Sequence, residues 1–187
     1  MIRNVAQQSC KQLDAKELQS RLAALPGNQG NSYEASEWIF QDSFQHTHTI
    51  SFALSNRVLD AYPEWMQKRD INPEALTKQI VLMLAERTVI TNYTKMFRGA
   101  LLWMAAMASN NLIAVTREML PVILSFRLTH SLSPSGVYPT REPVSYGSLS
   151  APRLITFLNI CEDLGLAGLG RNVTDNSVNK ALKKLLP

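Results

Sequence analysis

The sequence predicts a mostly α protein: a compact helical bundle of about six helices, with one short strand or extended segment near residues 47–54. Two observations predict this class. Apolar residues recur at helical spacing over most of the chain after residue 72, and these stretches begin at residues that cap helices well. The chain has 187 residues, 45% hydrophobic and 18% charged, which is the composition of a globular protein with its own core. We expect an N-terminal helix and a mixed segment over residues 1–70, and the helical bundle over residues 71–187 with a loop at 131–148.

The first predicted helix covers residues 13–25. Asp14 can cap the amides of its first turn, and Pro26 and Gly27 end it. The polar run that follows, up to Ser32, predicts a flexible link. The apolar face of this helix comprises Leu18, Leu22 and Leu25.

The next segment, residues 33–70, carries mixed signals. The aromatic cluster at residues 38–44 predicts a short buried turn or helix. Polar and apolar residues then alternate with a period of two over residues 47–54, which predicts a strand or extended segment. A helix over residues 56–66 is the competing continuation, and Pro63 predicts a break in it near Tyr62.

The helical signal is clearest between residues 72 and 129. Asn72 is a good N-cap and Pro73 suits the first helical position, so a helix is expected through Glu86. A second helix is expected over residues 92–109. A third covers residues 116–129, where Pro121 predicts either a kink or a regular part that begins at Leu120.

The C-terminal segment combines a loop with two further helices. Three prolines and two glycines predict the loop at residues 131–148. Ser150 can cap a helix over residues 150–164, which Gly165 ends. Thr174 or Asp175 caps the last helix, whose closing lysines suit the negative end of the helix dipole.

The positive charge is concentrated in the C-terminal two-thirds of the chain. Seven Lys and Arg stand against eight Asp and Glu in residues 1–70, six against three in residues 71–130, and six against four in residues 131–187, for a net charge of +4. Such an excess suits a polyanionic partner such as nucleic acid, and equally a solvated basic face.

Few residues suggest catalysis or metal binding. His46 and His48 form an H-x-H pair that would share one face of an extended segment, but no companion ligand stands at a metal-site spacing. We therefore predict structural histidines. Cys161 occupies an apolar helix position and predicts a buried, inert thiol, and Cys10 a second free thiol. We expect no catalytic residue, no metal and no cofactor in this chain.

A candidate nucleic-acid surface lies on the helix over residues 92–109. Thr91, Tyr93, Lys95 and Arg98 place hydroxyl and cationic groups on or near one side of it, while the other side is apolar. Side chains of these types contact phosphates and base edges. The alternative is the wet face of an ordinary amphipathic helix.

Residues 91–104, Thr-Asn-Tyr-Thr-Lys-Met-Phe-Arg-Gly-Ala-Leu-Leu-Trp-Met, resemble the central helix of the core-binding domain of tyrosine recombinases. Residues 111–120 resemble the loop and the Thr-started helix that follow in that family, and the likeness covers about residues 73–165. The resemblance implies a helical domain that clamps one side of duplex DNA, with Tyr93, Lys95 and Arg98 as contacts. The family's His-x-x-Arg is missing, because Ser131-Leu132-Ser133 follows His130. The chain would therefore bind DNA without cutting it.

We therefore expect double-stranded DNA as the partner. The predicted contacts are Thr91, Tyr93, Lys95, Arg98, Arg153 and Lys180. One alternative is a protein-interaction or self-associating subunit with aromatic anchors at Trp38, Phe40, Phe44 and Trp65. Another is a helix-turn-helix regulator that acts through residues 174–186, Asn179 and Lys180 among them. The N-terminus has no continuous apolar stretch and no run is long enough to cross a bilayer, so we expect a cytoplasmic protein without a membrane partner.

Overall fold

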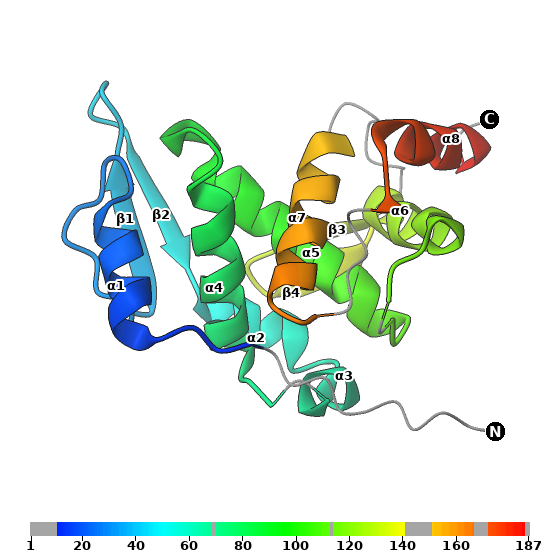
Figure 1. Ribbon diagram of the computed structural model, residues 1–187, viewed down its shortest axis with the longest axis horizontal. Helices are drawn as coiled ribbons and strands as arrows, with labels where there is room; N and C mark the ends of the chain where they lie inside the picture. Colours follow the sequence, from blue (N-terminus) through cyan, green and yellow to red (C-terminus); the bar gives the residue numbers. More distant parts are fainter. Residues whose placement is uncertain (1–10, 69, 113, 141–150, 167–171, 186–187) are drawn as a thin grey trace.

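The computed structural model describes residues 11–68, 70–112, 114–140, 151–166 and 172–185. Within these residues helices dominate, as predicted, and two small antiparallel sheets accompany them. The described helices number eight, more than the six expected, because the chain between the first and fourth of them folds into two additional short ones. The first helix and the first sheet lie at one end of the molecule, and the last helix at the other (Figure 1).

Helix α1 (Ala15–Ala23) begins as predicted, because the Asp14 carboxylate accepts hydrogen bonds from the amides of Lys16 and Glu17. The expected flexible link after α1 is wrong. Gly27 accepts from the amide of Gln41, and the side-chain amide of Asn31 pairs with both main-chain groups of Ile39. The link is therefore held along the edge of the first sheet.

Strands β1 (Glu37–Gln41) and β2 (Thr47–Ser51) form an antiparallel pair in which Trp38 lies opposite Ile50. The strand expected near residues 47–54 is confirmed over its first five residues. The buried turn or helix expected at residues 38–44 is wrong, because Trp38 and Phe40 are fully buried while the residues between and beside them face outward. That alternation is the period of a strand.

Three helices follow β2: α2 (Ala53–Leu59), α3 (Pro63–Gln67) and α4 (Pro73–Ala85). The predicted break at Tyr62 is confirmed, since Pro63 is the first residue of α3. Asn72 caps α4 as predicted, with its Oδ1 2.7 Å from the amide of Ala75.

A short 3₁₀ turn η1 (Ile90–Asn92) leads into α5 (Tyr93–Ser109), the longest described helix. A second turn, η2 (Arg117–Met119), precedes α6 (Leu120–Thr129). Of the two alternatives for Pro121, the second is therefore confirmed: the regular helix begins at Leu120.

The expected loop at residues 131–148 is wrong for its first part. Strands β3 (His130–Ser133) and β4 (Gly136–Pro139) form a hairpin in which Leu132 lies opposite Val137. Pro134 lies in the turn and Pro139 ends the second strand, so both prolines stand where a strand tolerates them. The remainder of that segment, residues 141–148, lies outside the described residues.

Helices α7 (Ala151–Asp163) and α8 (Asp175–Leu185) complete the chain. Gly165 follows α7 with a φ of 72°, as a helix-ending glycine requires. Thr174 Oγ1 accepts a hydrogen bond from the amide of Ser177, so Thr174 is the cap of α8. Helix α8 packs against α6 and α7.

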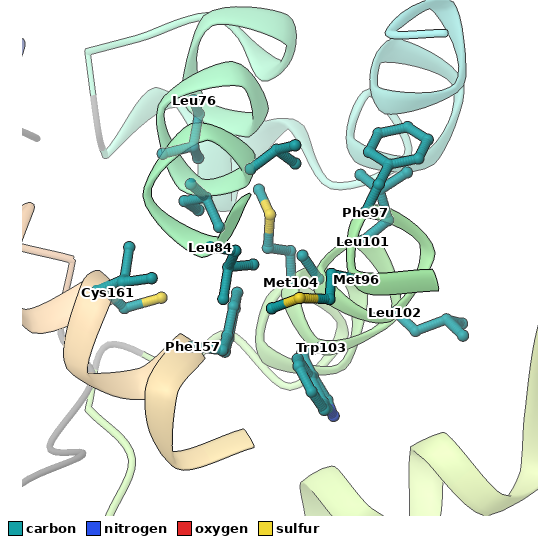
Figure 2. Close-up of a cluster of buried hydrophobic side chains, with 14 of the residues drawn as sticks. Leu76, Leu84, Met96, Phe97, Leu101, Leu102, Trp103, Met104, Phe157 and Cys161 are labelled. Atoms are coloured by element: carbon teal, nitrogen blue, oxygen red, sulfur yellow. The ribbon is translucent and has the colours of Figure 1, made fainter. Parts of the chain in front are cut away.

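The core is built around α5. Figure 2 shows Leu84 of α4 and Phe157 of α7 close to Trp103 and Met104 of α5. The rings of Trp103 and Phe157 lie 5.2 Å apart between centroids. Cys161 is 1% exposed, which confirms the buried thiol, whereas Cys10 lies outside the described residues.

In the described part of the chain, none of the helices combines the length and the apolarity that crossing a lipid bilayer needs.

Candidate nucleic-acid interface

The first turns of α5 present two of the predicted contacts together. Lys95 and Arg98 are both exposed, and a spacing of three residues places them on the same side of the helix. Thr91 is also exposed, in the turn η1 just before the helix. The structure thus brings Thr91, Lys95 and Arg98 to one end of α5.

Tyr93 is a correction to the predicted set. Its side chain is 1% exposed, and its ring packs edge to face against Phe40 with 4.9 Å between centroids. The reason is helical periodicity: Tyr93 shares a face with the buried Met96, Phe97 and Ala100, at i+3, i+4 and i+7. Burial raises the pKa of its phenol. Tyr93 is a core residue, and its side chain is not exposed for contact with a ligand.

Arg98 joins α5 to the hairpin β3–β4. Its Nη2 donates a hydrogen bond to the main-chain oxygen of Leu132, which is itself buried. At the turn of the hairpin, Arg57 of α2 donates from Nη1 to the oxygen of Pro134 over 2.6 Å. Two arginines from different helices therefore hold the hairpin in place.

Arg127, which was not among the predicted contacts, lies in the last turn of α6. It is half-buried, and burial together with the positive charge of Arg98 lowers the pKa of its guanidinium. We refer to Lys95, Arg98 and Arg127 as the basic cluster. No member of it forms an ion pair with an Asp or Glu of the described residues.

The hairpin adds hydroxyl groups to this region. Tyr138 is 46% exposed and lies opposite the exposed Ser131. The next residue of β3, Leu132, is buried and faces the core. Side chains alternate between the faces of a strand, so Ser131 and Tyr138 share the outer face of the hairpin. Sequence reasoning missed this surface because the prolines and glycines of the segment predicted a loop.

The remaining predicted contacts stand on other helices. Arg153 is half-buried in the first turns of α7, and Lys180 is exposed on α8. No hydrogen bond or ion pair within the described residues joins either side chain to the basic cluster. Helix α8 nevertheless packs against α6, the helix that carries Arg127.

Three of the four aromatic anchors expected for a protein partner are wrong. Trp38, Phe40 and Trp65 are at most 2% exposed and belong to the core. Phe44 is 77% exposed at the tip of the hairpin β1–β2. A single aromatic residue of the predicted set therefore remains available to a partner.

The predicted histidine pair has a structural explanation in the same hairpin. His46 Nδ1 and His48 Nε2 lie 3.3 Å and 3.1 Å from the same oxygen of Asp42. The amides of Phe44 and His46 also donate to the other oxygen of that carboxylate. Across the described residues, no group of three or more His, Cys, Asp or Glu side chains is arranged to hold a metal ion.

No family model, no curated protein and no solved structure matches the chain. The function must therefore be inferred from the chemistry of its surfaces, of which the basic cluster is the most distinctive.

Proposed function

We propose that this chain binds duplex DNA through its phosphate backbone, using the basic cluster and the adjoining outer face of the hairpin β3–β4. One observation supports the proposal more than the others. Arg127 is half-buried and is repelled by the positive charge of Arg98, and neither arginine has an acidic partner among the described residues. The proposal is for binding alone, without a catalytic group or a cofactor.

The electrostatics of this pair favour an anionic ligand. Two like charges that act on each other raise the free energy of the unbound protein, and partial burial of one of them adds a desolvation cost. A phosphate group between or beside them offsets both costs. Guanidinium groups are well suited to this role because their planar fork donates two parallel hydrogen bonds to phosphate oxygens.

Neighbouring groups extend the proposed phosphate-binding surface. Lys95 adds a third cation one turn from Arg98. Ser131 and Tyr138 add hydroxyl groups of the kind that often donate to phosphate oxygens. Contacts to phosphate oxygens position a duplex without reading its sequence, so the expected binding is weakly sequence-specific.

The resemblance to the core-binding domain of tyrosine recombinases supports the same partner. Of the DNA contacts that the resemblance implies, Lys95 and Arg98 are kept in the proposed site, and Tyr93 is removed because it is buried. Arg127 is added because of its place beside Arg98. A recombinase-type helical bundle and a cytoplasmic location remain part of this proposal.

Paired double variants test the proposal. Arg98→Ala with Arg127→Ala removes two positive charges from the basic cluster, and Lys16→Ala with Lys68→Ala removes two exposed charges from α1 and the end of α3. Binding to a labelled random-sequence duplex is measured across a salt series. We expect the first variant to bind at least about 10-fold more weakly with a salt slope smaller by about two, because each lost phosphate contact lowers the slope by about one.

The control variant distinguishes the loss of a specific binding site from a general reduction in net positive charge. Equal losses in the two double variants would show that only overall charge matters and would overturn the proposed site. A third variant, Lys180→Ala with Lys183→Ala on α8, covers the helix-turn-helix alternative. If this variant alone loses binding, the DNA contact belongs to α8.

A second candidate function is favoured by Phe44. Phe44 is 77% exposed at the tip of a hairpin, and aromatic side chains are enriched among the residues that anchor protein interfaces. Self-association through this residue is tested by the concentration dependence of the molar mass in light scattering. A mass that rises with concentration in the unmodified chain and stays monomeric in Phe44→Ser would favour an interaction protein.

A further inference from the structure

Strand β2 has an outer edge that pairs with no other strand of the described residues. The amide of Asp42 donates to the oxygen of His46, and the amide of Phe52 donates to the oxygen of Ser36, so these are hydrogen-bonded pairs of the hairpin. Such pairs recur at every second residue of an antiparallel ladder, and the residues between them turn their main-chain groups away from the partner strand. On β2 these residues are Thr47, Thr49 and Ser51. In the part of the chain that the structure describes, no hydrogen bond reaches their N–H or C=O groups.

The corresponding groups of β1 and β3 do have partners. The amide of Gln29, in the link after α1, donates to the outward oxygen of Ile39 on β1. On β3, Arg98 donates to the outward oxygen of Leu132. An open strand edge is a template for pairing with a further strand, and proteins that avoid such pairing often place Lys or Pro on the edge. Strand β2 contains neither residue.

The outer edge of β2 lies beside exposed side chains. Thr47 and Thr49 are exposed, and Ser51 is half-buried. The helices pack against the other face of the hairpin, where the Phe52 ring lies 5.7 Å from that of Phe97 on α5. Figure 1 shows the tip of the hairpin β1–β2 extending beyond the helices. A further strand along β2 therefore leaves this helix packing unchanged.

From this open edge we propose that the chain forms a symmetric dimer in which β2 pairs antiparallel with β2 of a second copy. Thr49 lies on the twofold axis, opposite Thr49 of the second copy, and Thr47 lies opposite Ser51 of the second copy. This register uses every outward main-chain group of β2 and forms about six hydrogen bonds, two for each pair. It joins the two hairpins into one continuous sheet. The proposal is independent of DNA binding, because β2 contains no residue of the basic cluster.

The composition of β2 favours a second copy as the occupant of this edge. A twofold axis brings identical strands together, so a charged residue close to the axis would meet a like charge, which is destabilising. Strand β2 carries no Asp, Glu, Lys or Arg. Threonine and serine side chains also form favourable cross-strand pairs with each other. The strand is therefore complementary to itself.

Phe44 gives a second reason to choose this occupant. It is 77% exposed at the tip of the hairpin, immediately before β2. Because the two β2 strands run antiparallel, each hairpin tip extends past Ser51 of the other copy toward the start of its α2. The dimer thus gives the self-association considered for Phe44 a main-chain interface, with the aromatic ring at each end of it.

The test begins with sedimentation equilibrium and NMR hydrogen exchange of the nucleic-acid-free full chain at neutral pH. We expect a dimer with a Kd in the micromolar range, because the paired surface is small. The amides of Thr47, Thr49 and Ser51 should be protected from exchange only at concentrations where the dimer forms. Those of His48 and Ile50 should be protected at every concentration, since they pair with β1.

A charge exchange at the twofold axis tests the register. Thr49→Lys and Thr49→Glu each place two like charges next to each other, so each variant alone should dimerise at least about 10-fold more weakly. A one-to-one mixture of the two should restore the dimer, because the new ammonium then lies opposite the new carboxylate. Ser36→Lys is the matched control. Ser36 is exposed just before β1, one strand further from the axis, so this variant should dimerise like the unmodified chain.

Three results would overturn the proposal. The unmodified chain could stay monomeric at millimolar concentration, Thr49→Lys could dimerise as well as Ser36→Lys, or the mixture could fail to restore the dimer. Phe44→Ser distinguishes the two parts of the interface. Loss of the dimer in Phe44→Ser with no loss in Thr49→Lys would assign self-association to the aromatic tip and exclude pairing through β2.

Discussion

Arg98 of α5 donates a hydrogen bond to the main-chain oxygen of Leu132, thirty-four residues later in the chain, and so joins the hairpin β3–β4 to the first turns of the helix. Burial and the positive charge of the same guanidinium lower the pKa of Arg127 on α6. One side chain therefore both fixes the hairpin and contributes to the unpaired positive charge of the basic cluster. Its two roles can be separated by substitution.

Arg98→Lys keeps the charge and removes the planar fork that reaches the hairpin. We expect the free energy of unfolding to fall by about 1–2 kcal/mol, because the carbonyl of the buried Leu132 loses its charged donor. Urea denaturation followed by circular dichroism measures this change. An unfolding midpoint identical to that of the unmodified chain would show that this hydrogen bond does not contribute to the stability of the fold.

Tyr93→Phe tests the correction made at the interface. The hydroxyl of Tyr93 is buried without a partner among the described residues, so its removal should leave stability unchanged or raise it by up to about 1 kcal/mol. Affinity for DNA should not change. Weaker DNA binding by a stably folded Tyr93→Phe would mean that the hydroxyl reaches the ligand, as the sequence resemblance implied.

Asp42 makes the first hairpin sensitive to acid. Burial raises the pKa of this carboxyl, but hydrogen bonds from His48, the amides of His46 and Phe44, and the His46 ring outweigh burial and lower the pKa to about 2. The folded pKa lies below the ordinary value of 3.8, so the ionised group stabilises the fold above that value. This contribution should be lost as the pH falls from about 4 to about 2.

Asp42→Asn should therefore be less stable than the unmodified chain at neutral pH. The difference between the two should shrink across the same pH window, because asparagine does not titrate. Thermal melts at a series of pH values measure it. A constant difference between pH 6 and pH 2 would contradict the account of Asp42.

Gly27→Ala tests the edge of the first sheet. Gly27 has a φ of 69°, and a Cβ there would collide with the main-chain oxygen of Gln41 and the side chain of Ile90. We expect a loss of about 1–3 kcal/mol in the free energy of unfolding, from backbone strain and displacement of the link. Gly30→Ala is the matched control, because Gly30 has a similar φ of 73° and open space around it. Equal losses in both variants would assign the effect to backbone conformation alone.

Most helices could be predicted from the sequence, because their signals are local. Asn72, Asp14 and the spacing of apolar residues along α5 determine where helices begin and which faces they bury. The strands were harder, since the alternation at Trp38 and Phe40 is too short to distinguish from a helical turn. Local spacing also contained the evidence that Tyr93 faces inward, which the resemblance to a DNA-binding helix obscured.

The basic cluster could be predicted only in part. Lys95 and Arg98 are close in sequence, so the helical repeat brings them together. Arg127 joins them through the packing of α6 and β3 on α5, and no pattern in the chain specifies that packing. The hairpin β3–β4 was not predicted from the sequence because it contains prolines. A proline in the interior of a strand breaks the strand, but a proline in a turn or at a strand end is tolerated.

The most direct test of the central claim is the salt dependence of duplex binding by the Arg127→Gln variant beside the unmodified chain. Arg127 was found from the structure alone, and glutamine removes its charge while keeping much of its length. If the basic cluster binds phosphates, Arg127→Gln should bind more weakly and its salt slope should be smaller by about one. An unchanged slope, or no binding of the unmodified chain at low salt, would contradict the proposal.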